Sequence, residues 1–176
     1  FRKKCEKQSH VRPPIGIPDP MPTENLVAET PELPTLEKLG YKNISNDART
    51  AIPFSGGETE AWARIQEYFW DTTQLSFYKK TRNGLLGKKY SSKLSLWMAF
   101  GSISPRSIYT EVTKYEKPVT KHDSTYWLIF DLIWPDYFKY ISLKHGSKIF
   151  KIGGVLAKSY DWKTNTRPVQ KWIDGN

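Results

Sequence analysis

Residues 90–95 read YSSKLS, and this stretch says most about the fold of the chain. It gathers the hydroxyls of Ser91, Ser92 and Ser95 and the ammonium of Lys93 just before an apolar run, where we predict a short helix that starts near Ser92. Free backbone amides and the helix dipole favour an anion at such a start. The local sequence leaves two interpretations open: a phosphate site, or serine capping beside a solvated lysine.

The segments around this stretch have the periodicity of amphipathic helices. After Gly56 and Gly57, apolar residues recur at helical spacing and predict a helix over 58–70, with acidic residues in its first turn. Its apolar face carries Ala61, Ile65, Tyr68 and Phe69. Ser104 followed by Pro105 is a strong start signal for another helix, lined by Ile108, Val112 and Tyr115. Alternating strand patterns are not found, so the sequence predicts a mainly α fold.

A further helix is predicted beyond residue 123, capped by Asp123 or Ser124. It carries a wide apolar stripe formed by Tyr126, Ile129, Phe130, Ile133, Trp134 and Tyr137. Pro135 lies inside this pattern and is expected to kink the helix or end its first half. We expect 162–172 to be loop with one short helical turn, and 33–39 to form a short helix that Gly40 stops.

The first part of the chain predicts an extended connector. Seven of the twelve prolines fall within 11–34, where they fix φ and remove backbone donors, which excludes regular helix or a central strand. We therefore expect residues 1–10 to be the tail of a preceding domain, 11–55 to be the connector, and 56–176 to be one helical domain. The chain begins with Phe1 and stops after an aromatic and basic stretch, as expected of a fragment or a processed piece.

Composition narrows the classes of function. The formal net charge of +9 favours an acidic partner such as nucleic acid, an anionic membrane surface or an acidic protein. Cys5 is the only cysteine, so the chain can form neither an internal disulfide nor a thiolate zinc site, and a reducing intracellular compartment fits best. The three histidines lack metal-ligand spacing, and neither a Gly-rich phosphate loop nor a catalytic triad is evident. We predict no catalytic or metal residue, and no apolar run approaches the roughly 18 residues of a membrane span.

Several ordered motifs resemble the flavin-binding region of the cryptochrome-DASH branch of the photolyase/cryptochrome family. They are GGE at 56–58, YKKTRNGLLG at 78–87, YSSKLSLW at 90–97, GSISPR at 101–106 and STYWLIFDLIW at 124–134. The resemblance covers nearly the whole chain. It implies that 56–176 is the N-terminal part of the all-helical FAD-binding domain, and that residues 1–10 are the tail of an α/β antenna domain.

The resemblance also implies particular residues and a chemistry. The pyrophosphate of FAD would be held by Ser91, Ser92, Lys93, Leu94 and Ser95, with Tyr78 also touching the cofactor. Arg82 would contact the DNA backbone, while Asp131 and Trp134 would face a flipped pyrimidine dimer. The implied chemistry is light-driven electron transfer from reduced flavin to that dimer in single-stranded DNA, or blue-light reception. Relatives in plants and algae suggest a plastid or a mitochondrion.

The sequence departs from the family at three functional positions. Leu96 replaces a usual proline, Asp131 a usual glutamate and Pro135 a usual arginine. An aspartate is one methylene shorter than a glutamate, so a hydrogen bond to a flipped base would be weakened or lost. The family's adenine and isoalloxazine contacts and its electron-relay tryptophans lie on helices beyond those recognised here, so we expect this fragment alone to be inactive.

Two other functions therefore stay open. One is a degenerate photolyase-like chain without FAD that serves as a structural or accessory subunit of a larger, organellar complex, with exposed aromatic residues covered by partners. The other is a basic nucleic-acid-binding module without cofactor. In every case we expect the seven tryptophans to pack in a core or an interface rather than to form a redox chain.

Overall fold

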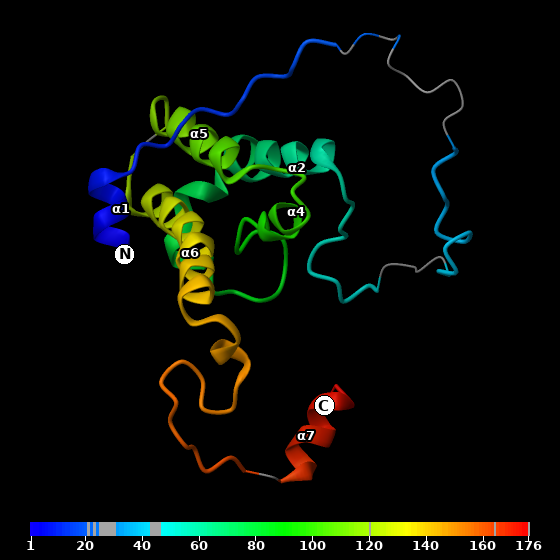
Figure 1. Ribbon diagram of the computed structural model, residues 1–176. Helices are drawn as coiled ribbons and strands as arrows, with labels where there is room; N and C mark the ends of the chain where they lie inside the picture. The colour runs from blue at the N-terminus through cyan, green and yellow to red at the C-terminus, as the bar shows by residue number, and fades with distance from the viewer. Residues whose placement is uncertain are drawn as a thin grey trace. The chain divides into compact units, whose positions relative to one another are not determined.

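The computed structural model describes residues 1–20, 22, 24, 31–42, 47–119, 121–163 and 165–175. Across these residues all regular secondary structure is helical (Figure 1), which confirms the mainly α fold class. The helical elements are α1 (Arg2–Gln8), α2 (Glu58–Ile65), η2 (Gln66–Asp71), η3 (Gln74–Phe77), α3 (Tyr78–Thr81), α4 (Ser95–Ala99), α5 (Pro105–Glu116), α6 (Asp123–His145), η4 (Gly146–Phe150) and α7 (Thr166–Ile173). The chain divides into two compact units, Phe1–Leu132 and Ile133–Asn176, which are described separately.

The core of the first unit is built from the apolar faces that the periodicity predicts. The buried hydrophobic residues are Ala61, Ile65, Tyr68, Phe69, Leu75, Tyr78, Leu94, Trp97, Ile103, Ile108, Val112, Tyr115 and Leu128. They come from α2, η2 and α5, from the short elements between them, and from the start of α6. Helix α5 packs on η2, where the ring of Tyr115 meets those of Phe69 and Trp70 at 6.3 and 5.4 Å.

The predicted helix over 58–70 is confirmed, with one change of geometry. Gly57, at a φ of 97°, precedes α2, and the backbone then widens into the π-helical segment η2 at Gln66. Thr72 ends this segment, because its hydroxyl donates to the Glu67 carbonyl at 2.7 Å. Thr73 follows in the left-handed region at a φ of 50°, which turns the chain into η3.

The start of α5 also agrees with the sequence. The Ser104 hydroxyl accepts from the Arg106 amide at 3.2 Å, and Pro105 occupies the first helical position. The cap satisfies one of the donors that every helix start leaves unpaired, and proline has no donor to lose there. One residue pair therefore fixes where this helix begins.

Helix α6 differs from the prediction in three respects. Its cap is neither Asp123 nor Ser124, because the Ser124 amide donates to the His122 side chain at 2.9 Å. It continues through Pro135 to His145, so the expected end at the proline is wrong, and the alternative, a kink at Pro135, stays a prediction. The side chains it buries are those of Ser124, Thr125 and Leu128, so the predicted aromatic stripe is not the buried face, and Tyr126 is 40% exposed.

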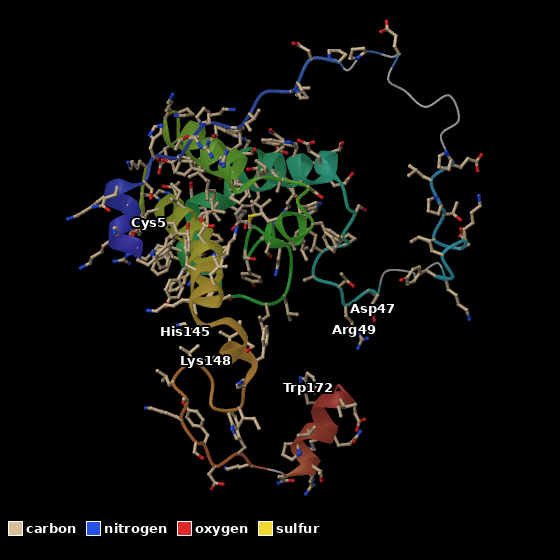
Figure 2. The ribbon with its side chains drawn as sticks, viewed as in Figure 1. Cys5, Asp47, Arg49, His145, Lys148 and Trp172 are labelled. Atoms are coloured by element: carbon tan, nitrogen blue, oxygen red, sulfur yellow. The ribbon has the colours of Figure 1, made fainter. Side chains whose placement is uncertain are left out.

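Residues 2–8 form helix α1, which the sequence did not reveal. The Tyr126 hydroxyl donates to the Glu6 carboxylate at 2.7 Å, and the Arg2 guanidinium lies 5.5 Å from the centre of the Phe130 ring. Helix α1 is therefore joined to the first part of α6. Residues 36–40 make a hydrogen-bonded turn in place of the expected short helix, and Gly40 ends it at a φ of 83°. On the segment leading to α2, Arg49 pairs with Asp47 at 2.7 Å (Figure 2).

The second unit contains the rest of α6, η4 and α7. Helix α7 has about two turns, more than the single turn expected, and begins where the Asn165 side chain accepts from the Arg167 amide at 3.1 Å. Trp172, labelled in Figure 2, is 80% exposed on it. No helix among the described residues is long and apolar enough to cross a membrane.

Candidate functional site

Only Ser95 of the segment 91–95 lies in helix α4, and residues 91–94 precede the helix instead of forming its first turn as predicted. Helix α4 starts at Ser95, three residues later than expected, with Leu94 as its N-cap residue. Lys93 has a φ of 59°, and a residue in the left-handed region cannot continue a right-handed helix. The Leu94 side chain is buried and holds the segment to the core, whereas Ser95 is exposed.

Arg64 on α2 holds this segment from the inside. The residue is only 4% exposed. Its Nε donates to the Ser92 carbonyl at 2.9 Å, and its Nη2 donates to the Ser91 carbonyl at 3.1 Å and to the Lys88 carbonyl. Its Nη1 donates to the Glu67 carboxylate at 2.9 Å. A planar guanidinium with five donors suits such a task, because it can bind several carbonyls at once.

The polar groups that remain on the segment are donors. Arg64 occupies the carbonyls of Ser91 and Ser92, while no hydrogen bond in the described part of the chain uses the amides of residues 91–95. The hydroxyls of the three serines and the Lys93 ammonium likewise have no partner among the described residues. Amides, hydroxyls and a cation are the groups that bind phosphate oxygens, so this donor set fits a pyrophosphate.

Charge around the segment is positive. The Glu67 carboxylate binds Lys88 at 2.5 Å and Arg64 at 2.9 Å. The hydrogen bond from Lys88 and the contact with Arg64 keep the pKa of Glu67 below its ordinary value, against the opposing effect of burial. One ionised carboxylate thus faces two cations, and the group as a whole carries a single positive charge.

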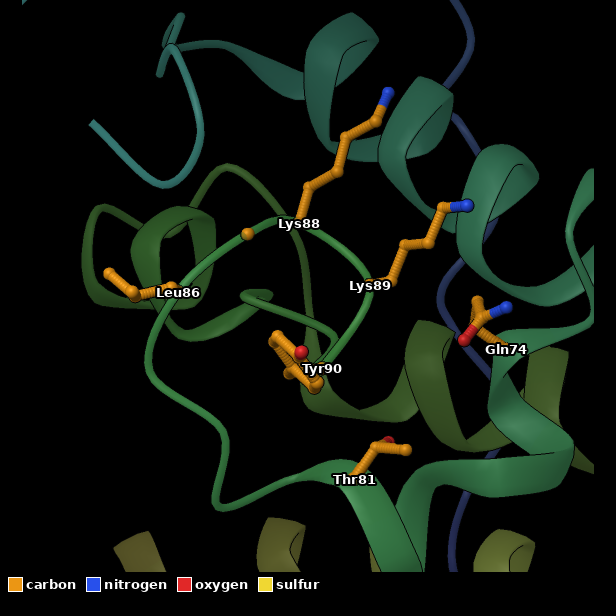
Figure 3. A pocket seen from close by; sticks show the side chains of 7 residues that line it. Gln74, Thr81, Leu86, Lys88, Lys89 and Tyr90 are labelled. Atoms are coloured by element: carbon orange, nitrogen blue, oxygen red, sulfur yellow. The ribbon is translucent and has the colours of Figure 1, made fainter. Parts of the chain in front are cut away.

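A cavity of about 630 Å³ opens beside the loop that precedes the segment (Figure 3). Its lining consists of Gln74, Thr81, Leu86, Gly87, Lys88, Lys89 and Tyr90. The Tyr90 ring packs against Gly84 so closely that a Cβ on this glycine would lie 2.5 Å from the ring. Gly84 therefore lets Tyr90 fold into the loop, and this contact shapes the side of the cavity.

Tyr78, Arg82 and Asp131 form a second polar cluster. The Tyr78 hydroxyl and the Arg82 guanidinium both donate to Oδ2 of Asp131 at 2.8 Å. The guanidinium also lies 4.8 Å from the centre of the Trp127 ring. Burial, reinforced by the bond to Asp131 and its charge, strongly raises the pKa of Tyr78, so its hydroxyl stays protonated.

Tyr78, predicted for the cofactor, thus shares one hydrogen-bond network with Arg82 and Asp131, which are predicted for nucleic acid. Trp134 lies three residues beyond Asp131 on α6 and belongs to the second unit, where it stacks on Phe138 at 5.6 Å and meets Tyr137 edge-on at 5.4 Å. The roles given to all these residues stay predictions. No group of three acidic, histidine or cysteine side chains in the described ranges could hold a metal ion.

Sequence reasoning missed Arg64, although a signal was present. Arg64 follows Ala61 by three residues and precedes Tyr68 by four, which places it on the apolar face of α2. A charged residue on a face that is buried requires partners inside the protein. The partners themselves, carbonyls 24 to 28 residues away, could not be read from the pattern.

Comparisons with known proteins agree with the resemblance. No family model matches the chain. It is 44% identical over 175 residues to Cryptochrome DASH of Danio rerio and 44% identical over 180 residues to Cryptochrome DASH, chloroplastic/mitochondrial, of Oryza sativa. These matches cover 99% of the chain but 34% and 31% of the two relatives. The crystal structure of a Synechocystis cryptochrome matches 99% of this chain and 36% of its own, with a TM-score of 0.87 and 42% identity. The chain thus spans about a third of the length of these relatives.

Proposed function

The chain belongs to the cryptochrome DASH branch of the photolyase/cryptochrome family, and we propose that it supplies the pyrophosphate-binding part of an FAD site. The observation that carries this proposal is the donor set of residues 91–95: Arg64 takes the carbonyls of Ser91 and Ser92, while the amides, the hydroxyls and the lysine of the segment have no hydrogen-bond partner among the described residues. Family members generally bind FAD, and the residues of this segment have the chemistry that its pyrophosphate requires.

Each residue of the segment has a distinct part in the proposal. The hydroxyls of Ser91, Ser92 and Ser95 would donate to phosphate oxygens, and the Lys93 ammonium would balance their charge. Leu94 is buried, so only its backbone amide could reach the ligand. The Tyr78 hydroxyl is engaged by Asp131, which leaves the ring of Tyr78 as the part that could touch a cofactor. Bound FAD would supply the photochemistry, by giving an electron from its excited reduced form.

For the whole protein we propose blue-light reception or light-driven repair of pyrimidine dimers in single-stranded DNA. Arg82 and Asp131 in the first unit, and Trp134 in the second, would each contact nucleic acid, in keeping with the net charge of +9. The name of the Oryza sativa relative refers to the chloroplast and the mitochondrion, so we also propose an organellar location. Expression of the tagged protein in plant cells tests that location directly.

The proposal is tested by the flavin content of the protein in the longest form in which the cell makes it. We expect flavin absorption bands in the protein as isolated, and weaker FAD binding after Lys93→Met. Lys117→Met is the matched control, since it removes an exposed ammonium that lies outside residues 91–95 and outside the cavity lining. If the wild-type protein shows no flavin bands even at saturating FAD, the proposal fails and a role without cofactor takes its place.

Receptor and repair functions separate in a second experiment. A single-stranded oligonucleotide with one cyclobutane pyrimidine dimer is mixed with the reduced, FAD-loaded protein and exposed to blue light. Loss of the dimer, followed by chromatography, supports repair. A light-dependent change in the flavin spectrum with the dimer intact supports reception. A salt-dependent affinity for the same oligonucleotide measures the contribution of the basic side chains.

A further inference from the structure

We infer that Arg64 is the positioning residue of this anion site, which it serves without contacting the ligand. The inference rests on the proposed function, because it concerns the same segment of donors. Its basis is that one buried guanidinium takes the carbonyls of Lys88, Ser91 and Ser92 together. The sequence analysis predicts no cofactor-binding residue on helix α2.

Arg64 sets the direction in which the amides of residues 92 and 93 point. A peptide carbonyl and the amide of the next residue point to opposite sides of the chain in an extended or turning segment. Arg64 draws the carbonyls of residues 91 and 92 toward α2, so the amides that follow them face away from α2. The left-handed φ of 59° at Lys93 belongs to the same turn, and successive amides in such a turn form a concave nest that binds anions.

Arg64 also brings positive charge to the segment. Arg64 is 4% exposed, and a buried guanidinium requires compensation. Glu67 is its one acidic partner among the described residues, and Glu67 also binds Lys88. Because this single carboxylate is shared, the buried charge is only partly balanced. The Arg64 guanidinium, the buried part of this charge, lies directly behind the segment that would hold an anion, whereas Lys88 is exposed to water.

The Arg64 side chain is itself held rigidly. The Arg64 guanidinium lies 4.9 Å from the centre of the Tyr68 ring, which is 1% exposed. The Tyr68 ring and the four hydrogen bonds restrict the Arg64 side chain to a single conformation. A loop tied at three carbonyls to such a group is held in its binding geometry before the ligand arrives, which lowers the entropic cost of binding.

The test compares Arg64→Lys with wild type in the longest natural form of the protein. A lysine keeps the charge but cannot reproduce the planar fork that reaches three carbonyls. We expect the affinity for FAD and for inorganic pyrophosphate to fall at least tenfold. Without ligand, the NMR order parameters of the backbone amides of residues 88–94 should fall from about 0.85 to below about 0.6, with those of the core residues of α5 unchanged. Arg49→Lys, at an exposed ion pair, is the matched control.

Unchanged affinity together with unchanged order parameters in Arg64→Lys would overturn the inference. If that variant does not fold, Glu67→Gln decides, because it keeps the three carbonyl bonds and removes the balancing charge. We expect Glu67→Gln to bind pyrophosphate as tightly as wild type or severalfold more tightly, and a fivefold loss would contradict the inference. If wild type binds neither FAD nor pyrophosphate, the proposed function fails, while the order parameters still show whether Arg64 holds the loop.

Discussion

Two buried tyrosines make a sharp prediction about alkaline unfolding. Burial raises the pKa of Tyr68 to about 12, and burial together with Asp131 strongly raises the pKa of Tyr78. Both hydroxyls ionise at their ordinary pKa of about 10 once the chain is unfolded. Between pH 10 and pH 12 the folded protein thus keeps two protons that the unfolded chain has lost, so the free energy of unfolding must decrease as pH rises.

The magnitude follows from the number of protons. Each proton retained only by the folded state changes the free energy of unfolding by about 1.4 kcal/mol per pH unit. Together the two tyrosines contribute a decrease of about 2.7 kcal/mol per pH unit in this window. Below pH 10 their contribution is constant, because both hydroxyls are then protonated in the folded and the unfolded protein. Tyr78→Phe and Tyr68→Phe should each reduce the slope by about 1.4 kcal/mol per pH unit.

Urea unfolding at closely spaced pH values, followed by tryptophan fluorescence, measures these slopes. Only the difference between wild type and each variant is interpreted, since other groups that titrate above pH 10 are common to both. Tyr160→Phe, at a site 48% exposed, is the matched control. At pH 7, Tyr78→Phe should also cost about 1.5–3 kcal/mol through loss of its bond to the Asp131 carboxylate. Equal slopes in wild type and Tyr78→Phe would refute the reasoning.

Three further predictions concern the scaffold of the site. Ser104→Ala should lower the free energy of unfolding by about 0.5–2 kcal/mol, because it removes the cap of α5; Ser104→Thr, measured by the same urea titration, should retain most of it. Ile108 is fully buried, so Ile108→Ala should lower the free energy of unfolding by about 2–5 kcal/mol and Ile108→Val by about 0.5–1.5 kcal/mol. Equal losses of stability for the two variants, measured by thermal unfolding, would contradict the packing around Ile108. Gly84→Ala should cost about 1–3 kcal/mol by forcing the Tyr90 ring away, and calorimetry should show a smaller cost when Tyr90→Ala is already present.

The fold was largely predictable because its signals are local. Helix α5 begins at Ser104 and Pro105 as their chemistry requires, and the apolar face of α2 becomes the core. The start of α4 was placed too early, since only the left-handed backbone of Lys93 delays it and nothing in a lysine predicts that conformation. Of the two outcomes expected at Pro135, an end of the helix is wrong, because α6 continues to His145. The proline removes the amide that would bond the Asp131 carbonyl and its ring crowds that carbonyl, and the other hydrogen bonds of this long helix keep it continuous.

The candidate site was predictable only as a set of donors. Hydroxyls and a lysine at 91–95 are visible in the sequence, but their accessibility depends on Arg64, whose partners lie 24 to 28 residues away in the chain. The cap of α6 illustrates the same limit. His122 accepts from the Ser124 amide, and this leaves the Ser124 hydroxyl to accept from the Lys79 amide at 3.2 Å, a contact between distant segments. Pairings between distant segments arise from packing, for which periodicity gives no signal.

The two donors on Asp131 differ in how firmly they hold it. Tyr78 is 6% exposed, so removing its bond would leave a buried hydroxyl without a partner, at a cost of about 1–3 kcal/mol. The Arg82 and Asp131 side chains are 31% and 25% exposed, and an ion pair so open to water contributes only about 0.2–1 kcal/mol. A DNA phosphate could therefore take Arg82 from Asp131 at small cost, while Tyr78 keeps the carboxylate in place. Tyr78, proposed to touch the cofactor, thus fixes Asp131, proposed to face the base, and Arg82 is the exchangeable member of the network.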